Sequence, residues 1–281
     1  MNVERGRLSM ETTVELNDGN AIPILGFGTF QVADGAECER AVLGALEVGY
    51  RHIDTAHVYG NESSVGRALA ESGVPREEVF VTTKTPFDLS PAAIRKAFEQ
   101  SLRKLRVEYV DLYLIHWPMT DELGPAWETL EQLRREGKCK SIGVSNFTAA
   151  RFEKAFWPRA GSAPAINQVE VHVFNQRRDL VDYCRRKGIQ VEAYSPLARA
   201  RRLSHPVLKR ISQECGRSPA QVMIRWLLQK GIVAIPKSVH RERIEQNAQV
   251  FDFALTTEQM ETLDGLDEDL TVQDWHPKGF Y

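Results

Sequence analysis

Four polar residues stand where short apolar runs of the sequence come to an end. Asp54 follows Arg-His-Ile, Lys84 follows Val-Phe-Val-Thr-Thr, and His116 follows Asp-Leu-Tyr-Leu-Ile. Tyr59 comes shortly after Asp54. A carboxylate, an ammonium, an imidazole and a phenol that meet in one cleft can deliver a proton to a carbonyl oxygen while its carbon is reduced. The residue types therefore predict carbonyl reduction, provided that the fold brings the four side chains together.

Each of these residues also has an ordinary structural explanation. An aspartate after a strand commonly caps a helix, a tyrosine commonly packs in a core, and a lysine is commonly solvated. A histidine at a strand end carries more weight where strand ends build an active site. Catalysis is favoured by the four positions together, so the argument depends on the elements that position them.

Short β-branched or apolar runs alternate with amphipathic stretches along the chain. We predict strands at 25–30, 52–56, 79–84, 110–116, 141–146, 165–170, 190–196 and 233–238. Their starts are roughly 25 to 30 residues apart, with one longer interval before the last, as a strand–loop–helix–loop repeat requires. Ser-Pro pairs at Ser90 and Ser218 predict two of the helix starts, because serine caps a helix and proline suits its first turn. Gly231 is expected to end the second of these helices.

Upstream, residues 13–22 predict a β-hairpin that turns at Asn17-Asp18-Gly19. Asp-Gly suits a tight primed turn, and we expect the hairpin to close the bottom of a barrel. The chain shows no linker or low-complexity segment, so we expect a single domain. It would comprise the hairpin (1–24), a barrel (25–245), and a C-terminal helix and tail over the cleft (246–281).

Eight alternating units in this length favour a (β/α)8 TIM barrel, an α/β fold, over a doubly wound sheet. The doubly wound fold would bind a dinucleotide on Gly-x-Gly-x-x-Gly, and the nearest approach, Gly26-Phe27-Gly28, lacks the third glycine. In a barrel the active site lies at the carboxyl ends of the strands, where Asp54, Lys84 and His116 are expected.

Composition narrows the class of protein. The 281 residues are 42% hydrophobic and 26% charged, with a formal net charge of -2, so no global field favours nucleic acid or an anionic membrane. The four cysteines are scattered without metal-ligand spacing, so no metal site is predicted and a reducing compartment is favoured. Because the first 24 residues lack an apolar signal core and no stretch reaches the length of a membrane span, we expect a cytoplasmic protein.

Several motifs occur together along nearly the whole chain. They are RHIDTA (51–56), HWP (116–118), GVSNF (143–147), NQVE (167–170) and IPKS (235–238). In combination they resemble the aldo-keto reductase family, barrel enzymes that reduce carbonyls with a nicotinamide cofactor. The resemblance is closest to small microbial members of the diketogluconate-reductase type.

The resemblance implies a role for each catalytic candidate. Tyr59 would be the general acid, and a free phenol has a pKa of about 10, which is high for that task. We expect the Lys84 ammonium to lower this pKa and Asp54 to hold Lys84 in place. His116 would donate to the substrate oxygen and orient the carbonyl.

The resemblance also implies a cofactor site. Ser145, Asn146 and Gln168 would hold the nicotinamide carboxamide, and Tyr194 would stack on the ring. The remaining cofactor-binding candidates are Gly28, Thr29, Ser195, Leu197, Lys237, Ser238, Arg243 and Asn247. Ser195 and Leu197 would meet the pyrophosphate, and Asn247 the adenine. Because the positions after the last strand serve the 2′-phosphate in this family, NADPH is favoured and NADH is the weaker alternative.

The predicted substrate pocket is aromatic. Its walls would be Phe30, Phe87, Trp117 and, from a tail folded back over the cleft, Trp275. An apolar pocket with one polar floor suits a small-molecule carbonyl substrate such as an aldehyde, α-dicarbonyl, keto-ester or keto-sugar. We expect a monomer, as is common among family members of this size.

Three alternatives belong to other classes. A barrel of this family can serve as a nucleotide-sensing subunit on a membrane channel, although the termini carry no basic extension. A barrel glycosidase would need two opposed carboxylates, for which Glu170 and Glu192 are candidates. A metal-dependent hydrolase would need clustered ligands, which His116 lacks, and an inactive scaffold is the remaining alternative.

Overall fold

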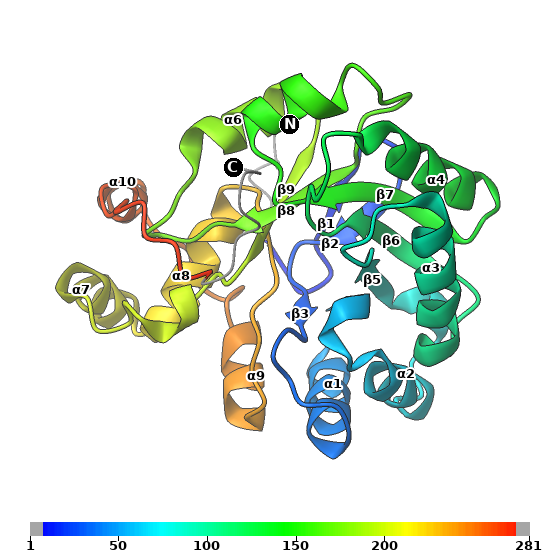
Figure 1. Cartoon of the computed structure of the whole chain (residues 1–281). Coiled ribbons are helices and arrows are strands. Elements are labelled where there is room, and N and C mark those ends of the chain that lie inside the picture. The colour runs from blue at the N-terminus through cyan, green and yellow to red at the C-terminus, as the bar shows by residue number, and fades with distance from the viewer. Residues whose placement is uncertain (1–7, 274–281) are drawn as a thin grey trace.

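Eight parallel strands stand side by side in chain order in the computed structural model, which describes residues 8–273 (Figure 1). They are β3 (Phe27–Gly28), β4 (His52–Asp54), β5 (Phe80–Lys84), β6 (Val110–Ile115), β7 (Cys139–Ser145), β8 (Ile166–Glu170), β9 (Gln190–Tyr194) and β10 (Val233–Ala234). A parallel bridge between Leu25 and Ala234 joins the two outer strands and closes the circle. The predicted (β/α)8 barrel is confirmed.

Helices surround the strands (Figure 1). Within residues 8–273 the α-helices are α1 (Ala36–Val48), α2 (Glu62–Glu71), α3 (Pro91–Leu105), α4 (Leu123–Arg135), α5 (Ala149–Arg151), α6 (Arg178–Arg186), α7 (Pro206–Cys215), α8 (Pro219–Gln229), α9 (Arg241–Ala248) and α10 (Thr257–Asp264). The shorter elements are η1 (His57–Tyr59), η2 (Arg76–Glu78), η4 (Ala198–Ala200) and the π-helix η3 (Phe152–Phe156). Two helices, α7 and α8, separate β9 from β10, which explains the long interval before the last predicted strand.

The predicted helix starts at Ser90 and Ser218 are confirmed. The Ser90 hydroxyl accepts a hydrogen bond from the Ala93 amide at 3.4 Å. Ser218 accepts from the Gln221 amide at 3.3 Å, and the Gln221 side chain accepts from the Ser218 amide at 2.9 Å. These contacts satisfy first-turn amides that have no partner within the helix.

The first and last barrel strands are shorter than predicted. Residues 25–30 contain only the two-residue β3, and residues 233–238 contain only the two-residue β10. Pro236 has no N–H to continue a ladder, although its carbonyl accepts from the Gly28 amide at 3.1 Å. The seam of the barrel therefore depends on single bridges and loop hydrogen bonds.

The predicted hairpin forms from β1 (Thr13–Glu15) and β2 (Ala21–Pro23), but its turn differs from the prediction. Within residues 16–20 only Gly19 has a positive φ, 84°, and its amide donates to the Leu16 carbonyl at 3.1 Å. This is a three-residue loop that ends in a left-handed glycine, so the primed turn was wrong. The Asn17 side chain, which donates to the Pro164 carbonyl at 2.9 Å, ties the loop to the barrel.

The hairpin closes the amino-terminal end of the barrel, as predicted. Its Leu16 and Ile22 side chains belong to an apolar cluster inside the barrel. The strand residues of this cluster are Phe80, Leu112, Leu114, Ile166 and Val233, and Ala165, directly before β8, also belongs to it. Inward-facing polar residues nearer the carboxyl ends of the strands therefore have an apolar plug beneath them.

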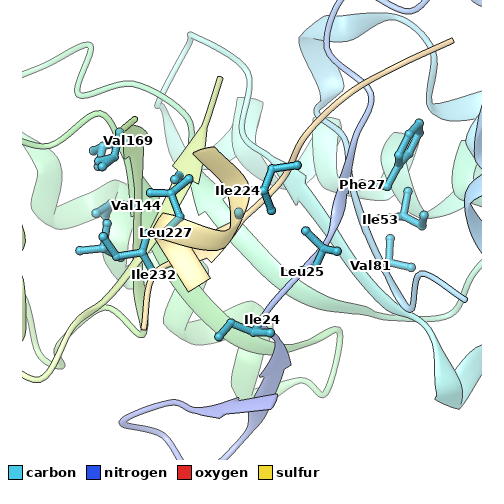
Figure 2. Close-up of a cluster of buried hydrophobic side chains, with 14 of the residues drawn as sticks. Ile24, Leu25, Phe27, Ile53, Val81, Val144, Val169, Ile224, Leu227 and Ile232 are labelled. Atoms are coloured by element: carbon cyan, nitrogen blue, oxygen red, sulfur yellow. The ribbon is translucent and has the colours of Figure 1, made fainter. Parts of the chain in front are cut away.

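A second apolar layer lies outside the strands, against the helices. Figure 2 shows Phe27, Ile53 and Val81 of adjacent strands close together, and all three are buried in this layer. Successive side chains of a strand point to opposite faces. Because Ile53 faces the helices, His52 and Asp54 face the barrel interior.

Candidate active site

Lys84 is the centre of a buried polar cluster inside the barrel. Its Nζ donates to the two carboxylate oxygens of Asp54 at 2.7 and 2.8 Å and to the Thr55 carbonyl at 2.8 Å. The Tyr59 hydroxyl oxygen lies 3.5 Å from the same Nζ. Lys84 is fully buried, so these groups replace its hydration shell.

The strand register accounts for this meeting. Asp54 pairs with Thr82 across β4 and β5. Lys84 lies two residues further along β5 and projects from the same face, one step nearer the mouth. Tyr59 ends η1, the turn that directly follows the β4 loop. Sequence spacing thus brings together three of the four predicted catalytic side chains.

His116 completes the predicted set from the residue after β6. Its ring centroid lies 5.6 Å from that of Tyr59, with the rings at 73°. Burial, with a further effect from the Lys84 cation, lowers the pKa of His116 well below 6.5. Its Nδ1 is buried and has no hydrogen-bond partner among the residues described. The imidazole is therefore neutral near pH 7.

The pKa of Tyr59 does not follow the prediction. We expected Lys84 to lower it, but burial raises it well above 10.0, and the charges of Asp54 and Glu192 add to this effect. The reason lies in the distances, since Lys84 is closer to the Asp54 oxygens than to the phenol. A carboxylate in direct contact largely cancels the field of the cation. Tyr59 is therefore a phenol at neutral pH.

The three residues predicted to hold a carboxamide and Tyr194, which was predicted to stack on the ring, lie together on or directly after β7, β8 and β9. The side-chain amide of Asn146 donates to Ser145 Oγ and to the His116 backbone carbonyl, each at 3.0 Å. Ser145 Oγ donates to the Gln168 carbonyl at 2.8 Å, and the Tyr194 hydroxyl donates to Asn146 Oδ1 at 2.8 Å. Asn146 has a left-handed backbone with φ 65°, a conformation that asparagine tolerates better than most residues.

Two buried neighbours of this cluster, Glu192 and His52, had no role in the predicted reductase site, and Glu192 was considered only as a glycosidase carboxylate. The Gln168 side-chain amide donates to Asp54 at 2.7 Å and to Glu192 at 2.8 Å. The His52 ring packs over Gly26, where an added Cβ would lie 2.4 Å from His52 Nδ1. The alternation of side chains on β4 and β9 was the available signal, since it places both residues on the inward face.

Three of the four predicted catalytic residues, Asp54, Tyr59 and His116, line one cavity, whose volume is about 530 Å³. Lys84 is fully buried and does not line it. Phe30 and Phe87 stand at its mouth, each 39% exposed, and the buried Trp117 also lines it. The Phe30 ring lies 5.0 Å from the Tyr59 ring. Trp275, the fourth predicted wall, lies outside the described residues.

The cavity has further lining residues that the sequence prediction did not include. They are Gln31, Val58, Pro196, Arg199, Ile235 and Gln273. The Arg199 guanidinium lies 5.9 Å from the Phe30 ring centroid and donates to Gln273 Oε1 at 2.9 Å. Arg199 belongs to an arginine-rich stretch with no strand or motif signal, so only tertiary contacts place it at the cavity.

The predicted cofactor residues divide into two groups. Gly28, Ser145, Asn146, Gln168, Tyr194, Ser195, Leu197 and Lys237 line the cavity. The other four do not line it. The Thr29 hydroxyl donates to the Asp54 backbone carbonyl at 3.0 Å, and Ser238 accepts from the His240 amide at 3.1 Å. Arg243 is exposed and Asn247 is buried on α9, beyond the cavity.

Neither carboxylate of the glycosidase alternative lines the cavity. Glu170 accepts from the Val272 and Gln273 amides at 2.7 and 3.0 Å. Glu192 is fully buried beside Gln168. Since a glycosidase needs two carboxyl groups that face the substrate, the structure does not support this alternative.

Within residues 8–273, no helix is long and apolar enough to cross a membrane. No cluster of three or more histidine, cysteine, aspartate or glutamate side chains there is arranged to hold a metal ion.

Comparison with known proteins identifies the class that this barrel and cluster define. The aldo/keto reductase family profile matches residues 24–268. Glyoxal reductase of Bacillus subtilis is 44% identical over 265 residues, which cover 94% of this chain and 96% of the relative. The chain belongs to the aldo/keto reductase family, a family of oxidoreductases.

Solved structures agree with this assignment. An aldo-keto reductase from a Medee basin deep-sea metagenome library superposes with a TM-score of 0.89 at 42% identity, covering 92% of this chain and 96% of that one. The aldose reductase from Schistosoma japonicum superposes with a TM-score of 0.86 at 36% identity, covering 93% and 94%. Both likenesses extend over nearly the whole barrel.

Proposed function

We propose that this protein reduces aldehydes or ketones to alcohols with NADPH, and that Tyr59 is the general acid. The observation that carries the proposal is the position of Lys84 Nζ, which touches both Asp54 oxygens and lies 3.5 Å from the Tyr59 hydroxyl. Tyr59 also lines the cavity, so its proton can reach a bound carbonyl.

Proton delivery follows from the charges around Tyr59. At neutral pH the phenol holds its proton, because burial raises its pKa well above the ordinary value. As negative charge develops on the substrate oxygen, the proton passes from the phenol to that oxygen. The nearby ammonium stabilises the phenolate that remains, and Asp54 keeps the ammonium in place.

His116 orients the substrate rather than supplying the proton. Because its pKa is lowered well below 6.5, it is neutral and can donate one N–H to the carbonyl oxygen. Together with Tyr59 it provides two donors on one side of the cavity. Two such donors hold the carbonyl oxygen in a fixed position.

The residues around the cavity fit a nicotinamide cofactor. A carboxamide needs a hydrogen-bond acceptor for its NH2 and a donor for its oxygen. The Gln168 side-chain oxygen offers the acceptor. The Ser145 hydroxyl and the Asn146 side-chain amide, which donate to the Gln168 and His116 backbone carbonyls, would turn one donor to the carboxamide oxygen, and Tyr194 offers an aromatic ring beside them. When bound, the cofactor supplies the hydride for the carbonyl carbon.

The preference for NADPH rests on the chain after β10. Lys237 borders the cavity, and Ser238 and Arg243 lie just beyond it at the start of α9. Two cations and a helix N-terminus favour an additional phosphate. We propose that these residues bind the 2′-phosphate, that Thr29, Ser195 and Leu197 lie along the cofactor, and that Asn247 meets the adenine.

The substrate class follows from the size and lining of the cavity. Its volume of about 530 Å³ must hold the nicotinamide end and the substrate together, which favours small carbonyl compounds. The relative named glyoxal reductase is consistent with small α-dicarbonyls. Keto-esters and keto-sugars of similar size are included in the proposal. We further propose a monomeric, cytoplasmic, single-domain protein.

The test follows the absorbance of NADPH with methylglyoxal, phenylglyoxal, diketogluconate and a keto-ester. In Tyr59→Phe, kcat should fall by about 10²–10⁴-fold while NADPH still quenches protein fluorescence. Tyr109→Phe, changed at a tyrosine that lies before β6 and away from the cavity, is the matched control and should retain activity. Cofactor binding without turnover of any substrate would favour the nucleotide-sensing alternative, and no binding would overturn both.

A further inference from the structure

Glu192 lies in the barrel interior beneath the cavity and takes no part in the reaction proposed above. It pairs with Gln168 in the register of β9 and β8. Its Oε2 accepts from Gln168 Nε2 at 2.8 Å, and its Oε1 lies 3.5 Å from His52 Nε2. The side chain is fully buried. A carboxyl group held away from solvent in this way needs a physical explanation.

The Gln168 amide is shared between two carboxyl groups. Its nitrogen donates to Asp54 Oδ2 at 2.7 Å and to Glu192 Oε2 at 2.8 Å. A side-chain amide has only two N–H groups, so both are used. Oxygen acceptors on both sides fix which end of the amide faces the interior. The side-chain oxygen of Gln168, Oε1, is therefore the polar atom of this amide that is left to face the cavity.

The titratable groups that face Glu192 come from two strands and a turn. Lys84 on β5 supplies a cation, Asp54 on β4 a carboxylate and Tyr59 on η1 a phenol. His52 on β4 is neutral, since burial lowers its pKa to about 3. Burial, and then the charge of Asp54, raises the pKa of Glu192 to about 8. Burial also raises the pKa of Asp54, but the Lys84 ammonium in direct contact opposes this effect and favours the proton on Glu192 rather than on Asp54.

We propose that Glu192 is a positioning residue of the reductase site. It holds the side-chain oxygen of Gln168 toward the carboxamide of the bound cofactor. This inference rests on the proposed function. Glu192 accepts one amide hydrogen, and Asp54 accepts the other. While protonated, Glu192 does so without placing a second negative charge next to Asp54. Once ionised at higher pH, it favours the cationic oxidised nicotinamide over the neutral reduced form.

Two variants separate the acceptor from the charge. Glu192→Gln keeps an oxygen that can accept from Gln168 and removes the titration, whereas Glu192→Leu removes both. The matched control is Glu62→Gln, since Glu62 is also fully buried but accepts from Thr83, away from the cavity. Thermal unfolding of the full chain establishes that each variant is folded.

The first readout is cofactor binding by quenching of protein fluorescence. Glu192→Leu should raise the NADPH dissociation constant by about 3- to 10-fold, the range expected for one lost hydrogen bond. Glu192→Gln and Glu62→Gln should bind NADPH like the wild type. If Glu192 only filled space, Glu192→Leu, which has a similar volume, would also bind NADPH like the wild type.

The second readout is pH dependence. In the wild type, the affinity for NADP⁺ relative to NADPH should rise as the pH passes about 8, and in Glu192→Gln this rise should be absent. Normal NADPH binding by a folded Glu192→Leu, or the same pH dependence in wild type and Glu192→Gln, would overturn the inference alone. A wild-type protein that binds no NADPH would overturn the proposed function as well.

Discussion

The Val272 amide donates a hydrogen bond to the buried carboxylate of Glu170 at 2.7 Å. The next amide, that of Gln273, and the Thr271 hydroxyl donate to the same carboxylate at 3.0 and 3.2 Å. Gln273 also lines the cavity. A residue at the end of β8 therefore anchors the segment that forms part of the cavity rim.

Loss of this anchor should weaken substrate binding more than catalysis. Glu170→Ala leaves two backbone amides without their acceptor, and hydrogen bonds to a charged group contribute about 1.5–3 kcal/mol each. We expect KM for the carbonyl substrate to rise several-fold, with kcat changed by less than about threefold. Steady-state kinetics at saturating NADPH measure this split. An unchanged KM would mean that the rim does not depend on Glu170.

The buried Asp54–Lys84 pair should show strong coupling in stability. Lys84→Met leaves the Asp54 carboxylate without its cation, and removal of one partner of a buried pair typically costs about 3–5 kcal/mol. The double variant Lys84→Met/Asp54→Asn should recover much of this loss, because no buried charge remains. Urea denaturation of the two single variants and the double variant gives the coupling energy. Additive losses would contradict the pairing.

His52 should make the protein sensitive to acid. Its pKa falls from 6.5 in the unfolded chain to about 3 in the folded protein. Between these values the unfolded state binds one more proton, so stability falls as the pH falls below 6.5. The loss from this group is up to about 1.4 kcal/mol per pH unit.

Replacement of the imidazole tests this assignment. In His52→Gln the free energy of unfolding should decrease less steeply between about pH 6 and pH 4 than in the wild type. Urea denaturation at several pH values measures both slopes. Parallel slopes would show that acid sensitivity comes from other groups, of which His116 is the nearest candidate because its pKa is also lowered.

The loop after β9 has an unusual backbone. Ala198, Arg199 and Ala200 all have left-handed φ values, 48°, 48° and 64°. This conformation costs an alanine about 1–2 kcal/mol. Because Ala200 is exposed, Ala200→Gly should relieve strain without loss of packing.

We expect Ala200→Gly to stabilise the protein by about 0.5–1 kcal/mol. This gain is smaller than the relieved strain because glycine has more conformational freedom in the unfolded chain, which opposes folding. Ala92→Gly, an exposed alanine within α3, is the control and should destabilise by about 1 kcal/mol. Thermal unfolding compares the two variants. A loss of stability in both would mean that the loop is not strained at Ala200.

Local patterns in the sequence were sufficient for most of the architecture. The strand–helix repeat and the caps at Ser90 and Ser218 depend on neighbouring residues, and the structure confirms them. The hairpin was also predictable, but its turn type was not. Asn17 bonds to the Pro164 carbonyl, a contact between distant parts of the chain that no local pattern reveals.

The chain order of the strands also placed Asp54, Lys84 and His116 at one end of the barrel, because parallel strands all point the same way. Tertiary structure decided what surrounds them. The bond from Gln168 to Asp54 crosses the barrel between strands that are not neighbours. The pKa of Tyr59 rises because of burial and, to a smaller extent, the charges of Asp54 and Glu192. Residue types and spacing specify which groups face inward, whereas distances and burial, which set their charges, exist only once the barrel closes.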